Sequence, residues 1–162
     1  MSKELARKVC ETAAGYIGVR ELAKNRGPEI DAWLLRVGLD PTKGAYPWCA
    51  AFAWCMLDDA CQEMEIQTPI RSSARVLTMW QRVPSRLVSL MPRVGSIFFH
   101  ATDPKDMSST GHCGIVTSVA GDHWVGIEGN TNGEGSREGD QVARQIRRFS
   151  YCNLGFADLE RV

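Results

Sequence analysis

Apolar residues recur three and four positions apart through the first half of the chain, the spacing that places side chains on one face of an α-helix. Proline and glycine mark the ends of these segments, since proline suits a first helical turn and glycine suits a stop. Four helices are predicted, from Ser2 to near Gly18, from Gly27-Pro28 to Gly38, from Trp48 to Met64 and from Ser73 to Trp80. The third is apolar on all sides over its first turns, which indicates a helix buried at the centre of the fold.

After Pro84 the pattern changes to short apolar runs separated by glycine, aspartate, serine and asparagine, which is typical of strands and turns. About five strands are predicted, at residues 93–100, 112–120, 123–130, 141–148 and 154–159. Residues 120–123 predict a tight hairpin between two of them. Helices followed by consecutive strands predict an α+β domain, in which the N-terminal helices pack on one face of an antiparallel sheet.

Length and charge narrow the classes of function. The 162 residues are enough for one domain, residues 1–162, with its own hydrophobic core. Nineteen basic residues balance nineteen acidic ones, so we expect neither nucleic-acid binding nor charge-driven binding to a membrane. Residues 1–20 carry charges throughout and lack the apolar core of a secretory signal, so we expect synthesis in the cytoplasm.

Six cysteines are present, and in a chain without a secretory signal we expect them to be reduced. No two of them are separated by two residues, so neither a redox pair nor a zinc ribbon is indicated. Cys49, Cys55 and Cys61 are six residues apart and would lie on different faces of a helix, where they cannot share a metal ion. A packing role is expected for five of the six.

The segment AYPWCAAFAWCML, residues 45–57, gives the remaining cysteine a chemical role. Pro47 fits the first position of a helix, which would place Cys49 in the first turn. The positive end of the helix dipole lowers the pKa of a thiol there, and only the thiolate is a nucleophile. The unpaired N–H groups of the same turn could bind an oxyanion.

The predicted strands supply partners for this thiol. His112 opens one strand between Gly111 and Gly114, and glycines at such places let another segment or a substrate approach closely. On the next strand Glu128 and Asn130 would point to the same face, because side chains alternate along a strand. A cysteine at a helix start, a histidine and a polar pair are the parts of a cysteine nucleophile site.

The segments PWCAAFAWC, VGSIFFH, GHCGIVTSV and WVGIEGNTN, in this order, resemble the CHAP family of cysteine peptidases and amidases that cut the bacterial cell wall. The resemblance covers nearly the whole chain and implies a papain-like fold. By position it implies Cys49 as nucleophile, His112 as base, Glu128 as the residue that orients the base and Asn130 as a further polar member.

The sequence departs from the family pattern in one feature, and two other histidines remain candidates for the base. Some family members bind calcium in an acidic loop ahead of the cysteine, but residues 38–47 contain Asp40 as their one carboxylate, too few for a calcium site. We therefore expect no metal and no cofactor. His100 and His123 are alternative candidates for the base, since both lie at strand edges beside turn residues.

Substrate-binding residues are expected close to the cysteine. Trp48 precedes it directly, and Glu21 and Asn25 lie in the loop after the first helix. A capped loop between two helices explains Glu21 and Asn25 equally well.

These features predict a single-domain, monomeric peptidoglycan hydrolase without a separate wall-binding domain, acting as a peptidase or an N-acetylmuramoyl-L-alanine amidase. The expected context is a phage endolysin that reaches the wall from the host cytoplasm by holin-type release or secretion. Three alternatives stay open: an antibacterial effector with the same chemistry, a lysozyme-like glycosidase using Glu128 with a second carboxylate, and a wall-binding module that has lost activity.

Overall fold

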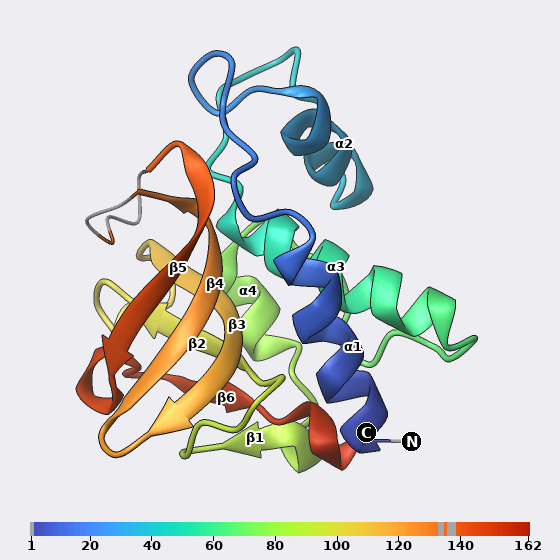
Figure 1. Ribbon diagram of the computed structural model, residues 1–162. Helices are drawn as coiled ribbons and strands as arrows, with labels where there is room; N and C mark the ends of the chain where they lie inside the picture. Colours follow the sequence, from blue (N-terminus) through green and yellow to red (C-terminus); the bar gives the residue numbers. More distant parts are fainter. Residues whose placement is uncertain (1, 133–134, 136–138) are drawn as a thin grey trace.

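Helices lie beside one antiparallel sheet in the computed structural model, which describes residues 2–132, 135 and 139–162 (Figure 1). The α-helices in these ranges are α1 Ser2–Ala14, α2 Pro28–Arg36, α3 Cys49–Glu63 and α4 Val76–Gln81. The strands are β1 Val88–Ser89, β2 Ile97–Ala101, β3 Gly111–Ala120, β4 His123–Thr131, β5 Gln141–Arg148 and β6 Gly155–Ala157. The 3₁₀ turns are η1 Ser85–Leu87, η2 Phe149–Tyr151 and η3 Leu159–Arg161. The predicted α+β, papain-like class is confirmed.

The sheet has the strand order β1-β6-β2-β3-β4-β5, so the C-terminal strand β6 lies between β1 and β2. Five of these strands correspond to the predicted ones. The remaining strand, β1, was not predicted, because its two residues are too few to show an alternating pattern. The predicted hairpin is confirmed: β3 and β4 are joined through Gly121, whose positive φ of 60° suits a tight turn.

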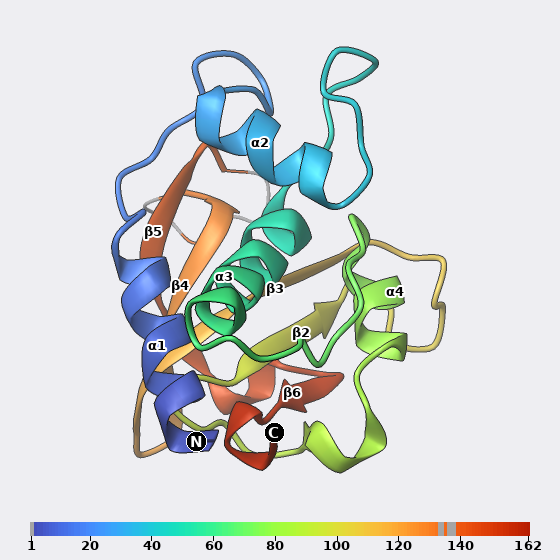
Figure 2. The same ribbon diagram turned by 90° about the vertical axis from the view of Figure 1, so that its right-hand side faces the viewer.

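Helix α3 is the central helix, as its all-round apolar pattern predicted. Ten of its 15 residues are buried, and it packs against α1, β3 and β4. Figure 2 looks onto the helical layer, with α3 running between α1 and α4 in front of the sheet. This burial fixes the direction of α3 and therefore the position of its first residue.

The face of the sheet away from the helices has a small aromatic core of its own, which the sequence pattern did not reveal. Phe98, Val116, Trp124 and Phe156 form this second cluster, and side chains of the η2 turn pack against it. Phe98 and Trp124 have ring centroids 5.6 Å apart. The sheet is therefore covered on both faces, by helices on one and by an aromatic cluster on the other.

Two predicted helix starts need correction. Trp48 is the N-cap of α3 and Cys49 its first helical residue, so Pro47 lies before the helix and not at its first position. Helix α4 begins at Val76 and not at Ser73, because the Ser73 hydroxyl accepts a hydrogen bond of 3.0 Å from the Arg75 N–H and forms a turn.

None of the helices within residues 2–132, 135 and 139–162 combines the length and the apolar composition needed to cross a lipid bilayer.

Candidate active site

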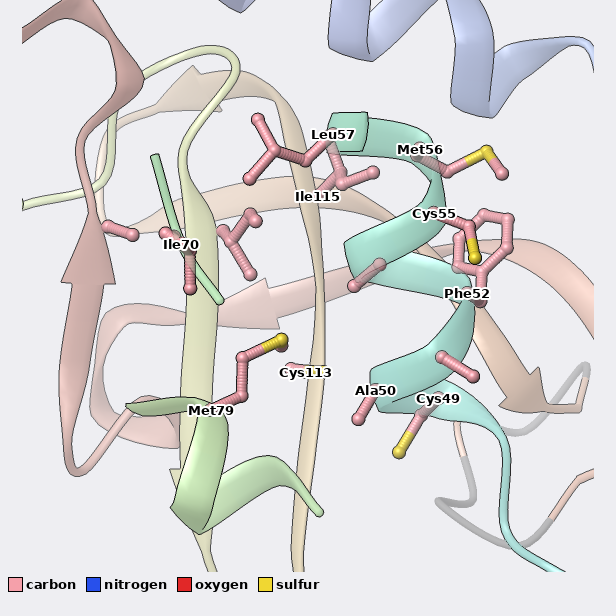
Figure 3. Close-up of a cluster of buried hydrophobic side chains, with 14 of the residues drawn as sticks. Cys49, Ala50, Phe52, Cys55, Met56, Leu57, Ile70, Met79, Cys113 and Ile115 are labelled. Atoms are coloured by element: carbon pink, nitrogen blue, oxygen red, sulfur yellow. The ribbon is translucent and has the colours of Figure 1, made fainter. Parts of the chain in front are cut away.

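Cys49 lies at the first position of α3, where the helix dipole acts most strongly on a side chain (Figure 3). The N-cap Trp48 makes no side-chain capping hydrogen bond, so the first N–H groups of the helix have no capping partner from it. The ring of Trp48 is fully buried and lies 5.7 Å from the Trp33 ring. The tight packing of Trp48 therefore fixes the position of the neighbouring Cys49 thiol. The exposed fraction of Cys49 is 4%.

His112 lies near the start of β3 and is fully buried. Its Nε2–H donates a hydrogen bond of 2.7 Å to Oε2 of Glu128, which is also fully buried. The opposite ring nitrogen, Nδ1, is buried and makes no hydrogen bond to the described residues. The Cys49 thiol is a neighbour of the imidazole, and its interaction with the ring raises the pKa of His112. The ring of His112 therefore joins the thiol to a carboxylate.

Glu128 has a second partner, Arg147 of β5. The guanidinium donates from Nε to Oε1 at 2.9 Å and from Nη2 to Oε2 at 2.6 Å. Only 11% of the Arg147 side chain is exposed. Four groups, Cys49, His112, Glu128 and Arg147, therefore form one connected row.

The pKa values in this row favour a thiolate–imidazolium pair. Hydrogen bonding from Cys113, together with the nearby imidazole of His112, holds the pKa of the Cys49 thiol well below its usual range, although burial acts to raise it. Burial would lower the pKa of His112, but the hydrogen bonds to Cys49 and Glu128 raise it to about 9. Burial would raise the pKa of Glu128, but Arg147 and His112 lower it. At neutral pH the thiol is thus ionised and the imidazole protonated.

Cys113 takes part in the site although its sequence position suggested only packing. It is fully buried on the helical side of the sheet, and its thiol and backbone N–H both act to lower the pKa of the Cys49 thiol. Burial raises the pKa of the Cys113 thiol well above its usual range. Cys113 therefore stays neutral and can stabilise the Cys49 thiolate as a donor. The sequence showed that Cys113 directly follows His112 on the strand. It did not show that the start of α3 would lie against Cys113.

The reason given for pairing Asn130 with Glu128 does not hold. The register of β4 against β5 shifts between Glu128 and Thr131, and Asn130 has a positive φ of 55°. The regular alternation that would place both side chains on one face is therefore broken. Asn130 is buried, with 2% of its surface exposed. Its catalytic role stays a prediction.

The glycines around His112 make room for the protein's own groups. A Cβ on Gly111 would lie 2.6 Å from Leu77 Cδ1 of α4, and a Cβ on Gly114 would lie 2.8 Å from Glu128 Cγ. The groups that approach these glycines closely are therefore side chains of the protein itself, from α4 and from Glu128.

Two cavities adjoin the start of α3, and Pro47 lines both. The first, about 300 Å³, is mainly apolar and contains Cys49. The second, about 290 Å³, is polar and is lined by residues that include Glu21 and Asn25. Trp48 lines neither of these two cavities.

The two oxygens of Glu21 hold the loop after α1 against the start of α3. Oε1 accepts a hydrogen bond of 2.9 Å from Trp48 Nε1, and Oε2 accepts one of 2.7 Å from the Asn25 N–H. Asn25 has a positive φ of 56°. This loop is therefore structurally held, while substrate binding by Glu21, Asn25 and Trp48 stays a prediction.

The two other histidines are engaged elsewhere. His100 Nδ1 lies 2.7 Å from the Tyr151 carbonyl oxygen, and its ring stacks on the Tyr151 ring at 4.4 Å. His123 begins β4 and pairs with Asp122. Within the described part of the chain, no group of three or more His, Cys, Asp or Glu side chains is arranged to hold a metal ion.

Comparison with known proteins adds a family match. The CHAP domain family model matches residues 41–130, more than half of the chain, and this segment includes Cys49, His112, Glu128 and Asn130. No curated protein matches the chain. Two crystal structures of Ly7917 are similar to it, one of them with the hydrolyzing product of MDP, at 13% and 16% identity and TM-scores of 0.46 and 0.39. Each match covers 94% of this chain, which spans 60% of the Ly7917 chain.

Proposed function

Because the chain belongs to the CHAP domain family, we propose that it hydrolyses an amide bond of bacterial peptidoglycan with Cys49 as the nucleophile. Membership of this family implies a cysteine peptidase or amidase that acts on peptidoglycan. The observation that carries the assignment to residues is the row from Cys49 through His112 to Glu128, with its 2.7 Å hydrogen bond between buried side chains. A thiol beside an imidazolium at a helix start is an activated nucleophile.

The mechanism follows from the charges of these groups. The Cys49 thiolate attacks the carbonyl carbon of the amide, and the first N–H groups of α3 stabilise the oxygen that becomes negative. His112 then gives its proton to the leaving amine, which leaves an acyl group on the Cys49 sulfur. A water molecule loses a proton to His112 and attacks this thioester, so the acid is released and the thiolate is restored.

Activity should fall at alkaline pH. The leaving amine needs a proton from His112, and this proton is lost as the pH rises through the His112 pKa of about 9. The kcat/KM for a soluble peptidoglycan fragment should therefore be constant around neutral pH and should decline with an apparent pKa near that value. A decline centred on about 6.5, the ordinary pKa of histidine, would contradict the thiolate–imidazolium pair.

The glycosidase alternative requires a different state of Glu128. A general acid in a glycosidase needs a raised carboxyl pKa, so that it holds a proton to donate. The pKa of Glu128 is lowered, since the hydrogen bonds from Arg147 and His112 outweigh the effect of burial. Glu128 is also fully buried. These features favour an orienting role for Glu128 over an acid role at a sugar.

Among the amide bonds of peptidoglycan, we favour the peptide stem or cross-bridge over the sugar–peptide junction. The support is the mainly apolar cavity of about 300 Å³ beside Cys49, to which Leu39, Val76 and Leu77 contribute side chains. Such a cavity suits a compact uncharged side chain, for example that of alanine, better than a hydroxylated sugar ring.

Lysis of the host wall late in phage infection is the biological role that we favour, with holin-type release from the host cytoplasm. An antibacterial effector would use the same chemistry at the same residues. Expression in a host with and without a co-expressed holin tests the proposed route of release, since an endolysin made in the cytoplasm should lyse the culture only when the holin is present.

The bond type can be read from the products of digestion. A thiolate forms an acyl-enzyme from an amide but has no ready route through a glycosidic acetal. Purified peptidoglycan should therefore yield new primary amines, or free stem peptides with sugar-linked lactyl acids, and no new reducing sugar ends. Cys49→Ser, which keeps the shape of the site, is the matched control. Reducing ends that appear in step with the loss of turbidity would contradict the thiol mechanism.

A further inference from the structure

Arg147 is a largely covered cation at the end of the catalytic row, with 11% of its side chain exposed, and neither the family match nor the sequence motifs assign it a role. The family match ends at residue 130, before the strand that carries it. Its two hydrogen bonds to Glu128, at 2.9 and 2.6 Å, engage both carboxylate oxygens. Such a bidentate arrangement fixes the plane of a carboxylate as well as its charge. Oε2, which accepts from Arg147, is also the oxygen that accepts from His112.

The fold leaves a path for this contact across the sheet. Arg147 is paired in register with Trp124, and Glu128 with Ala143, so the two residues lie at different levels along β4 and β5. Gly126 lies between these levels, and a Cβ added there would be 3.6 Å from Glu128 Oε1. The side chain of Glu128 therefore extends over Gly126 toward Arg147.

Other contacts hold the guanidinium in place. Arg147 Nη2 also donates a hydrogen bond of 3.0 Å to the Gly135 carbonyl oxygen. The guanidinium carbon lies 4.2 Å from the centroid of the Tyr151 ring, which is a cation–π contact. Because this side chain is fixed on two sides, its direction does not depend on the state of His112.

The charged and titratable groups around Glu128 come from four elements. His112 and Cys113 lie on β3, Cys49 begins α3, Tyr151 ends η2 and Arg147 lies on β5. Burial raises the pKa of Tyr151 to about 12 and that of Cys113 well above its usual range, so both are neutral at neutral pH. Among these groups, the negative charges of Cys49 and Glu128 are balanced by the positive charges of His112 and Arg147. Removing Arg147 would leave a buried carboxylate that lacks one of its two cations, which is costly.

We propose that Arg147 is a positioning residue for catalysis, an inference that rests on the proposed thiol chemistry. It keeps Glu128 ionised and directs it at His112 Nε2, and this holds the imidazolium against the Cys49 thiolate. Without it, Glu128 takes up a proton as the pH falls, and a neutral carboxyl supports the imidazolium less.

The test is the pH dependence of Cys49 alkylation by iodoacetamide in the full chain, followed by mass spectrometry of the Cys49 peptide. The loss of a cation within contact distance shifts a carboxyl pKa upward by about one to three units. The acid limb of the alkylation profile marks the loss of the Cys49 thiolate, so in Arg147→Met it should shift to higher pH, by up to about that amount. Arg147→Lys keeps the charge but not the bidentate contact, so its limb should lie in between. Arg144→Met, an exposed arginine on the same strand, is the matched control and should match the wild type.

A structural role alone predicts a different result. An Arg147→Met protein that melts like the wild type and alkylates with an unshifted acid limb would overturn the proposal, whether or not its rate is uniformly lower. If Arg147→Met does not fold, Arg147→Lys provides the test. An unshifted acid limb in Arg147→Lys would then overturn the proposal. Alkylation needs no peptidoglycan. A wild-type protein with the expected profile but no hydrolysis of peptidoglycan would refute the proposed function and leave the role of Arg147 standing.

Discussion

Replacing Cys49 with alanine should abolish peptidoglycan hydrolysis while the protein stays folded. The Sγ atom is the attacking group, and no other thiol among the described residues combines a lowered pKa with a place at the cavity. Loss of the nucleophile should reduce kcat by at least about 10⁴-fold. Removing one buried heavy atom costs roughly 1 kcal/mol of stability, so thermal unfolding should change little. Release of soluble fragments from purified peptidoglycan measures the loss.

Cys55→Ala is the matched control for this variant. Cys55 lies on the same helix, is fully buried, and burial raises the pKa of its thiol to about 12. It should retain activity in proportion to its folded fraction. Near-normal activity in Cys49→Ala, together with a loss of activity in Cys55→Ala or Cys113→Ala, would show that the nucleophile is misassigned.

The His112→Ala variant should lose at least about 10²- to 10⁴-fold in kcat/KM, the usual contribution of a positioned acid–base group. The imidazole performs two tasks in the mechanism, since it stabilises the thiolate and supplies the proton for the leaving amine. Its removal also takes one of the two cations from Glu128, so circular dichroism and thermal unfolding are needed beside the activity assay. Assays from acidic to alkaline pH should show no limb near pH 9 in this variant.

His100→Ala and His123→Ala serve as controls, because the structure gives these rings other partners. His100 contacts Tyr151 and His123 pairs with Asp122. Both variants should remain within a few-fold of the wild type. A loss larger than that of His112→Ala at either position would assign the base to that residue.

Much of the fold follows from local pattern in the sequence. The period of apolar residues predicted α2 and α3 closely, because burial on one or all sides of a helix leaves a direct trace. The place of Cys49 followed from the same helix, although Pro47 lies two residues before the first helical residue and not at that position. The strands were predicted where the alternation of apolar and polar residues was long enough to recognise. Strand β1 has two residues and was therefore not predicted.

The parts that could not be predicted depend on how strands are registered and how they bend. Arg147 reaches Glu128 across a sheet pairing that the sequence does not specify, and β5 carries other arginines that look alike in pattern. The irregular backbone at Asn130 breaks the alternation on which its placement rested. The contact of Cys113 with Cys49 depends on where α3 crosses β3, which only packing decides. Such contacts join residues far apart in sequence and leave no local pattern.

The most direct measurement of the central claim is competitive labelling of all six cysteines with a limiting amount of iodoacetamide at about pH 6. The thiolate of Cys49 should react well before the others, because hydrogen bonds from Cys113 and His112 lower its pKa while burial raises the pKa values of Cys10, Cys55, Cys61, Cys113 and Cys152. Peptide mapping should find the label on Cys49, with activity lost in proportion to its labelling. Labelling of another cysteine first, or full activity in protein that is labelled at Cys49, would contradict the account.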